Sequence, residues 1–186
     1  MPARRNGMRV LYGRRAIAKR VRELARALDL AYDGRAVTLC GVLTGGAVFA
    51  ADLARAMRND RVSLDFLKAS SYGRGTRSSG TVRLTVLDPA GVRGRDVVVV
   101  EDILETGRTL RAVADALLRR GARSVRSVVL LEKPVPREAG LLPDWVGFRM
   151  RTAAFVCGYG LDAGHRWRNL PDIVVAPRPA GGRGAR

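Results

Sequence analysis

The stretch Val97–Thr109, which reads Val-Val-Val-Val-Glu-Asp-Ile-Leu-Glu-Thr-Gly-Arg-Thr, decides the fold of this 186-residue chain. A run of four valines is typical of a central strand that is buried on both faces of its sheet. Apolar residues at helical spacing follow, and Gly121 is a suitable residue to end that helix. The stretch therefore predicts a strand that leads directly into a helix. The apolar residues predicted on one face of this helix are Leu110, Val113, Ala114, Leu117 and Leu118.

Strands and helices alternate along the rest of the chain, which predicts an α/β fold with a mostly parallel central sheet flanked by helices. The first helix is predicted over residues 14–29, where apolar side chains recur at spacings of four, three and four. A second helix carries Phe49, Leu53 and Met57 on one stripe. The predicted strands cover residues 36–42, 62–69, 81–87, 125–131, 145–148, 153–157 and 173–176.

The composition is that of a globular protein, with 47% hydrophobic and 27% charged residues. The 34 Lys and Arg residues against 17 Asp and Glu residues give a formal net charge of +17. Such a surface attracts polyanions, so nucleic acid, phosphorylated metabolites and acidic lipids are candidate partners. Arginine supplies nearly all of this charge and can also reflect genomic base composition. Much of the charge is then a solvated background.

Other features of the sequence narrow the class of protein. The two cysteines, Cys40 and Cys157, stand in no CxxC or Cys/His metal pattern and cannot form a disulfide framework. No apolar run approaches the roughly 18 residues of a membrane-spanning helix. The basic N-terminus is not followed by an apolar stretch of the signal-peptide type. We therefore expect a soluble protein in the reducing cytoplasm, without membrane contact.

Two adjacent carboxylates carry the main chemical signal. Glu101 and Asp102 stand at the C-terminal end of the valine strand, where open α/β sheets bind ligands. Carboxylates there can accept hydrogen bonds from a sugar diol. The segment Glu105–Thr109 then turns into a helix whose free amides, dipole and threonine hydroxyls suit a phosphate, and Gly107 permits close approach of the backbone. The P-loop lysine is missing, so the pattern favours a ribose 5-phosphate rather than a nucleoside triphosphate.

The stretch 97–110 resembles the phosphoribosyl-diphosphate motif of type I phosphoribosyltransferases, and more of the chain resembles their hypoxanthine-guanine branch. The resemblance runs from about residue 11 to 176. It implies a single domain over residues 1–176, with a small hood from the terminal segments, and a disordered Pro/Gly/Arg tail over 177–186. The further matching segments are Gly41–Gly46, Ser70–Tyr72, Leu130–Lys133, Val146–Phe148, Phe155–Asp162 and Arg168–Pro171.

The resemblance implies purine salvage: magnesium-dependent transfer of 5-phosphoribose from phosphoribosyl diphosphate to hypoxanthine or guanine, which gives IMP or GMP and pyrophosphate. Relatives of this family form homodimers or homotetramers. In the family, a non-proline cis peptide stands in the pyrophosphate loop. Three carboxylates are implied to hold the Mg2+ ion. They are Asp162, Glu101 and Asp102.

The resemblance also assigns the remaining site residues. The 5-phosphate and ribose would lie against Glu101, Asp102, Glu105, Thr106, Gly107, Arg108 and Thr109, with Glu105 as the catalytic residue. Pyrophosphate would lie against Thr44, Gly45 and Arg168, and the purine against Lys133, Phe155, Val156 and Asp162. The polar, glycine-rich segment 70–80, with Ser71 and Tyr72, would be a mobile lid. An ordinary strand-to-helix turn remains an alternative for Thr44–Gly46, and a long hairpin connection for 70–80.

Three features depart from the family pattern. Glu105 stands where the family usually has Asp, and Thr44 replaces the usual lysine. The segment between Phe148 and Phe155 is about one residue longer than usual. Two alternatives stay open. One is a phosphoribosyltransferase-like regulator that binds nucleic acid and senses nucleotides; the other is an enzyme for another base, such as xanthine or uracil.

Overall fold

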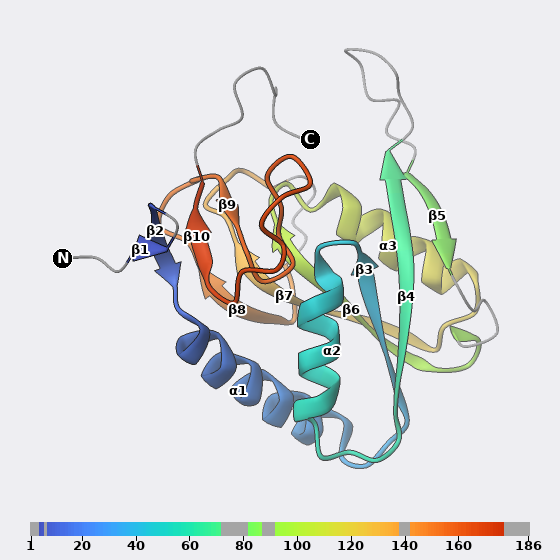
Figure 1. Cartoon of the computed structure of the whole chain (residues 1–186). Coiled ribbons are helices and arrows are strands. Elements are labelled where there is room, and N and C mark those ends of the chain that lie inside the picture. The colour runs from blue at the N-terminus through green and yellow to red at the C-terminus, as the bar shows by residue number, and fades with distance from the viewer. Residues whose placement is uncertain (1–3, 6, 72–81, 87–91, 138–141, 177–186) are drawn as a thin grey trace.

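The computed structural model describes residues 4–5, 7–71, 82–86, 92–137 and 142–176, and a six-stranded sheet forms its centre (Figure 1). The strands of this sheet are β3 (Val37–Leu43), β4 (Val62–Ser71), β5 (Val82–Val86), β6 (Asp96–Leu104), β7 (Ser124–Glu132) and β8 (Trp145–Arg149). Their order is β5-β4-β3-β6-β7-β8, and only β5 runs antiparallel to its neighbour. The predicted α/β fold with a mostly parallel sheet is confirmed.

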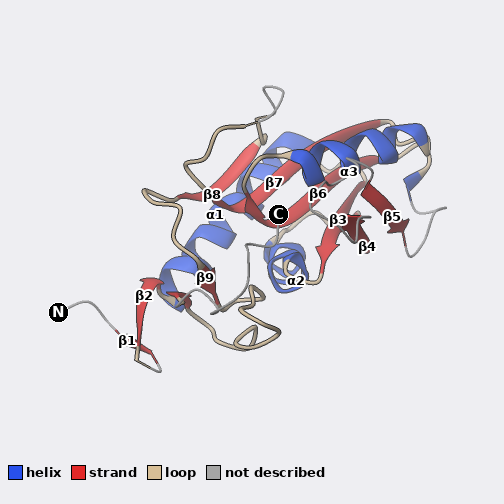
Figure 2. Cartoon of the chain, turned by 90° about the horizontal axis from the view of Figure 1, so that it is seen from above, coloured by secondary structure: helices blue, strands red, loops and turns tan. Residues whose placement is uncertain are grey.

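Helices cover both faces of this sheet. One face carries α1 (Arg14–Tyr32) and α2 (Gly46–Ala56), and the other carries α3 (Arg108–Arg119). Figure 2 shows α2 and α3 on opposite sides of the strands. Along β6, Val98 and Val100 pack in the core beside α1 and α2, whereas Val97 and Val99 pack in the core beside α3. All four valines are fully buried, as predicted for a central strand.

A small antiparallel sheet joins the two ends of the described chain. Its strands are β1 (Arg4–Arg5), β2 (Met8–Tyr12), β9 (Val156–Cys157) and β10 (Ile173–Val175), in the order β1-β2-β10-β9. Figure 1 shows the blue N-terminal strands beside the orange-red C-terminal ones. This sheet is the hood expected from the terminal segments. The sequence pattern did not predict β1 and β2, and β9 is shorter than the predicted 153–157.

Several predicted boundaries are corrected by the structure. The segment 70–80 was expected to be a loop, but β4 continues through Ser71, because Ser70 and Ser71 pair with Arg83 and Val82 of β5. The rest of that segment, including Tyr72, lies outside the described residues, as does the tail 177–186. Helix α1 runs three residues beyond 29 and ends at Tyr32, which is buried in the core. The single domain over 1–176 stays a prediction.

The prediction of which residues form the buried face of α3 is also wrong in part. Leu118 is 49% exposed, whereas Ala116 is buried beside Leu117. Gly121 follows the helix with φ +87°, in agreement with its predicted role after the helix end. None of the helices in the described part of the chain is long and apolar enough to cross a membrane.

The parallel strands β3, β6 and β7 bring their carboxyl ends to one edge of the sheet. The peptide bond Leu43–Thr44 at the end of β3 is cis, as the resemblance implies. Next to it lie the turn between β6 and α3 and the start of the loop after β7, where Lys133 donates its backbone N–H to the carbonyl of Leu104 at 3.0 Å. The candidate site therefore lies at this edge of the sheet.

Candidate active site

The two adjacent carboxylates at the end of β6 differ in exposure, because Glu101 is buried and Asp102 is half-buried. Glu101 is only 7% exposed, and its Oε2 atom is buried without a hydrogen-bond partner among the described residues. Burial, together with the neighbouring charge of Asp102, raises the pKa of Glu101 to about 8. Burial also raises the pKa of Asp102 to about 6. The unpartnered buried oxygen of Glu101 is costly for stability, and strongly raised pKa values of this kind are common at binding and catalytic sites.

The start of α2 packs directly on this carboxylate pair. A side chain at Gly45 would place its Cβ 1.7 Å from Oδ2 of Asp102, and one at Gly46 would come within 2.9 Å of the carbonyl oxygen of Val100. Only glycine fits at Gly45, because the Asp102 carboxylate already occupies that space. The loop predicted to hold pyrophosphate therefore lies against the carboxylates, with Thr44 exposed beside it.

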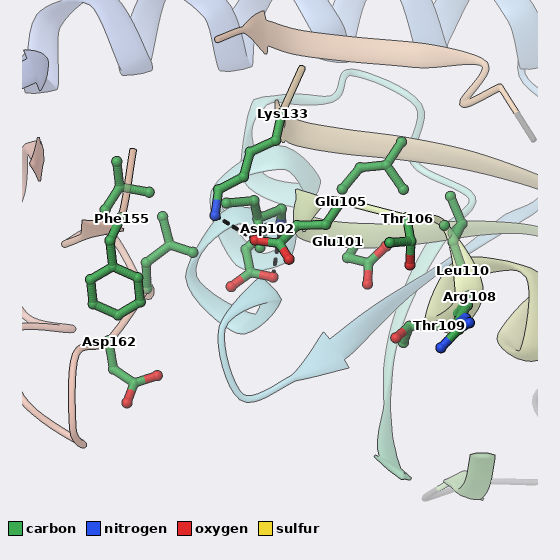
Figure 3. A pocket seen from close by; sticks show the side chains of 15 residues that line it. Glu101, Asp102, Glu105, Thr106, Arg108, Thr109, Leu110, Lys133, Phe155 and Asp162 are labelled. Atoms are coloured by element: carbon green, nitrogen blue, oxygen red, sulfur yellow. Dashed lines mark hydrogen bonds and ion pairs between the residues drawn. The ribbon is translucent and has the colours of Figure 1, made fainter. Parts of the chain in front are cut away.

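The turn between β6 and α3 is the segment predicted to cradle a phosphate. Gly107, with φ +84°, is the residue immediately before α3, in a backbone conformation that favours glycine. The first amides of a helix have no partner inside the helix and form the positive end of its dipole. Thr106 is exposed and Thr109 half-buried at this end of α3 (Figure 3). A phosphate monoester fits this arrangement without a P-loop lysine.

Lys133 reaches across the cavity from the end of β7. It is 9% exposed, and its ammonium Nζ forms an ion pair with Oε1 of Glu105 (the dashed line from the Lys133 nitrogen in Figure 3). The predicted base-reading cation and the predicted catalytic carboxylate are therefore in direct contact.

The opposite wall comes from the C-terminal part of the chain. Phe155 lies half-buried next to Val156 of β9, and Figure 3 shows it across the cavity from the α3 turn, beside Asp162. Asp162 accepts a hydrogen bond from the backbone N–H of His165 at 2.8 Å and pairs with Nη2 of Arg168 at 2.7 Å. The Arg168 guanidinium is therefore fixed beside the Asp162 carboxylate.

These elements enclose a cavity of about 550 Å3, the size of a small-molecule site. Thr44, Gly45 and Arg168 are not part of its wall, although Gly45 contacts Asp102 and Arg168 contacts Asp162. Ser71 belongs to β4, and Tyr72 is outside the described residues. The predicted residues that line the cavity are Glu101, Asp102, Glu105, Thr106, Gly107, Arg108, Thr109, Lys133, Phe155, Val156 and Asp162.

Four apolar residues of the wall were not predicted. They are Ile103, Leu104, Leu110 and Leu161. Each stands next to a predicted polar residue, and this adjacency was the available signal. Leu104 and Leu110 are each 1% exposed, so they pack on the core side of the turn between β6 and α3.

Carboxylate oxygens are the candidate metal ligands of this site. Within the described residues, His, Cys, Asp and Glu side chains form no group of three that could hold a metal ion, so Glu101, Asp102 and Asp162 do not make one joint cage. The unpartnered Oε2 atom of Glu101 is nevertheless an oxygen donor beside a second carboxylate. Magnesium commonly takes one or two carboxylates and completes its shell with water and substrate phosphates. The donors therefore fit magnesium bound together with a phosphorylated substrate.

Comparison with known families decides where the chain belongs. Residues 10–163 match the family model described as "Phosphoribosyl transferase domain". The chain belongs to this family. Within it, the chain is 40% identical over 167 residues to the hypoxanthine-guanine phosphoribosyltransferase of Bacillus subtilis. The matched region covers 90% of this chain and 92% of that protein. This relative places the chain in the hypoxanthine-guanine phosphoribosyltransferase family.

Solved structures of the phosphoribosyltransferase family share the fold. A hypoxanthine-guanine phosphoribosyltransferase from Bacillus anthracis, with a HEPES molecule in its active site, matches with a TM-score of 0.83 and 35% identity over 90% of this chain and 98% of that one. A longer relative, the bifunctional protein TilS/HprT of Listeria innocua, is 42% identical over 90% of this chain. The chain spans only about a quarter of that relative, 26% of its length.

Proposed function

We propose that this protein is a purine-salvage enzyme that transfers 5-phosphoribose from phosphoribosyl diphosphate to hypoxanthine or guanine. The products are IMP or GMP and pyrophosphate. The observation that carries the proposal is the joint wall of one cavity, where the buried Glu101 with the half-buried Asp102, a helix N-terminus and a nearly buried lysine face the same space. Family membership supports the same reaction.

The sugar phosphate is held by β6 and α3 in this proposal. Glu101 and Asp102 accept hydrogen bonds from the ribose hydroxyls, while the amides and hydroxyls of residues 106–109 hold the 5-phosphate. The diphosphate extends toward Thr44–Gly45 on one side and toward Arg168 on the other. A guanidinium suits the second position, because its planar donors match phosphate oxygens.

The base is read on the opposite side of the cavity. An ammonium has donors and no acceptor, so Lys133 favours the 6-oxo group of hypoxanthine or guanine over the 6-amino group of adenine. The ring of Phe155 stacks on the purine, and the backbone of Val156 contacts its far edge. The same pair of residues argues against uracil as the preferred base.

The reaction breaks the bond from ribose C1 to the diphosphate oxygen and forms a bond from C1 to the purine nitrogen. The pyrophosphate departs with the electron pair, and C1 gains positive charge during the transfer. We propose that Glu105 accepts or holds the proton near purine N7, within reach of Lys133. The protein contributes orientation of the two substrates, stabilisation of developing charge and exclusion of water.

Magnesium is proposed as the cofactor. Glu101 and Asp102 would hold it on the sugar side and Asp162 on the diphosphate side, in each case with water and substrate oxygens. When bound, the ion neutralises the charge that develops on the departing diphosphate. We further propose that the protein acts in the cytoplasm. We also propose that it forms a homodimer or a homotetramer, and light scattering on the purified protein will distinguish these two oligomeric states.

One observation favours a second candidate function, a regulator that binds nucleic acid. Arg15, Lys19, Arg22 and Arg26 recur at spacings of four, three and four along α1, so that they share one face, and all four are exposed. If this face binds single-stranded RNA, log K should fall with log salt at a slope of about −3, and four Gln substitutions should abolish that slope. Binding that does not depend on the RNA sequence and disappears at moderate salt would show only nonspecific electrostatic attraction, and it would not support a regulator.

A panel of bases tests the proposed enzyme. Purified protein with magnesium and phosphoribosyl diphosphate should convert hypoxanthine and guanine to their nucleotides and leave adenine and uracil unreacted. Including xanthine in the same panel ranks this third 6-oxopurine against hypoxanthine and guanine. No product from hypoxanthine, guanine or xanthine would remove the enzyme proposal and favour the regulator.

A further inference from the structure

The segment 158–168, which we name the Asp162 loop, is a closed hydrogen-bonded unit. The backbone N–H of Gly160 donates to the carbonyl of Arg168 at 3.0 Å, and Nη1 of Arg168 donates back to the carbonyl of Gly160 at 2.6 Å. Arg168 also pairs with Asp162. Because these contacts join the two ends of the loop, its proposed diphosphate-side groups keep one arrangement relative to each other.

A hydrogen bond between side chains ties this loop to α2. The hydroxyl of Tyr159 donates to Oδ2 of Asp52 at 2.8 Å, although the two residues are 107 positions apart. Tyr159 is 8% exposed. Its backbone has φ +52°, and its N–H donates to the carbonyl of Leu170 at 2.7 Å. Both backbone and hydroxyl of Tyr159 are therefore engaged, and neither Tyr159 nor Asp52 lines the cavity.

The loop also lies tightly against the beginning of α2. A Cβ at Gly160 would come within 2.4 Å of the carbonyl oxygen of Gly45, and Gly160 has φ +95°, so only glycine fits there. Helix α2 itself is anchored by the buried side chains of Phe49 and Leu53. The contact brings the backbone of the Asp162 loop next to the loop at Thr44–Gly45.

We infer that Tyr159 and Asp52 are positioning residues that set the separation between the two sides of the diphosphate site. One side is the Thr44–Gly45 loop at the start of α2, and the other is the Asp162 loop with Arg168. This inference rests on the proposed function. A diphosphate that must contact both sides binds well only if their separation is set in advance, because any adjustment is made at the expense of binding free energy.

The polarity of the Tyr159–Asp52 bond is also defined. Burial, the hydrogen bond to Asp52 and the Asp52 charge all raise the pKa of Tyr159, so the phenol stays protonated and remains the donor. The other carboxylate oxygen of Asp52 faces Arg55 at 3.7 Å, with the Arg55 side chain 82% exposed. Substitution of Arg55 therefore offers a matched control that touches the same carboxylate from its solvent side.

The test separates positioning from general destabilisation. Tyr159→Phe removes only the hydroxyl, and we expect it to raise KM for phosphoribosyl diphosphate and the calorimetric Kd for magnesium pyrophosphate about tenfold. KM for hypoxanthine should stay within about twofold. Asp52→Ala should reproduce this effect, Asp52→Asn should restore most of the affinity because its amide oxygen still accepts the bond, and the double variant should be no worse than either single one.

The outcomes are distinct. Arg55→Ala should leave both constants at the wild-type values. Wild-type pyrophosphate affinity in Tyr159→Phe, or an equal rise of KM for both substrates, overturns the positioning role. A wild-type protein that forms no nucleotide with any purine overturns the proposed function instead, while the pyrophosphate titrations of wild type and variants still decide the role of Tyr159.

Discussion

Lys133, at the end of β7, and Glu105, in the turn after β6, form an ion pair across the cavity. Lys133 is nearly buried, whereas the Glu105 side chain is 42% exposed. A 6-oxopurine that takes a hydrogen bond from the ammonium must therefore share or replace this contact. In the proposed enzyme, the pair places a cation for the 6-oxo group next to a carboxylate for the proton near N7. Base recognition and proton handling are thus coupled in the proposed enzyme.

Substitution of Glu105 tests its proton-handling role. Glu105→Gln keeps the shape but cannot accept the proton, so we expect kcat to fall by about 10²-fold or more, with KM for phosphoribosyl diphosphate within about twofold. Glu105→Asp, which restores the usual residue of the family, should remain active. Steady-state kinetics with hypoxanthine will measure both variants. Unchanged turnover in Glu105→Gln would exclude this role.

Substitution of Lys133 tests base recognition. Lys133→Gln replaces the buried ammonium with a neutral amide, and we expect KM for hypoxanthine to rise about 10- to 100-fold, the effect of losing a charge-assisted hydrogen bond. The discrimination against adenine should weaken as well. The matched control is Lys68→Gln on β4, where the lysine is exposed. Equal effects of the two substitutions would refute a base contact by Lys133.

Gly45 tests the packing of α2 against the carboxylate pair. In Gly45→Ala the new methyl would meet Oδ2 of Asp102 at 1.7 Å, so either the loop or the carboxylate must move. We expect kcat/KM for phosphoribosyl diphosphate to fall about 10²-fold, because displacements of about 1 Å have such effects in active sites. Gly13→Ala is the control, because a Cβ at Gly13 would lie 3.8 Å from its nearest neighbour, Oδ1 of Asp172, which is an ordinary contact distance. Wild-type kinetics for Gly45→Ala would mean that this close contact has no functional role.

Asp96 tests stability away from the cavity. Hydrogen bonds from Arg123 and Ser124 lower its pKa to about 2. A carboxyl whose pKa is lowered on folding stabilises the native state above its unfolded pKa of about 3.9 and loses this contribution as pH falls toward 2. Asp96→Asn should therefore unfold several degrees below wild type at pH 7, and the difference should shrink from pH 4 to pH 2. Thermal unfolding at several pH values measures this difference.

The control for this pH series is Asp60→Asn, at an exposed position in the loop before β4. It should unfold at the wild-type temperature throughout the series. A constant difference between Asp96→Asn and wild type down to pH 2 would show that the ionised carboxylate is not the stabilising form.

Local sequence patterns were sufficient for most of the central sheet and for the part of the cavity wall between β6 and α3. The buried run Val97–Val100 and the turn at Gly107 depend on neighbouring residues, so pattern reading located both. Phe155, Val156 and Asp162 were found through a resemblance, because no local pattern distinguishes a base-stacking phenylalanine from an ordinary core residue.

Features that depend on distant partners could not be predicted in this way. Ser70 and Ser71 have polar side chains typical of loops, yet pairing with β5 makes them a strand. The bond from Tyr159 to Asp52 joins residues 107 positions apart, and neither side chain carries a local signal for the other. Leu118 fits a helical stripe but lies beyond the edge of the core, so it remains exposed.

The most direct test of the central claim measures IMP and pyrophosphate together from magnesium, phosphoribosyl diphosphate and hypoxanthine. The comparison is between the wild-type protein and the double variant Glu101→Gln/Asp102→Asn, which keeps the shape of both side chains but replaces the carboxyls with amides that cannot ionise. We predict equal amounts of both products from wild type and a rate at least about 10²-fold lower from the variant. No IMP from wild type, or the same rate from both proteins, would contradict the account.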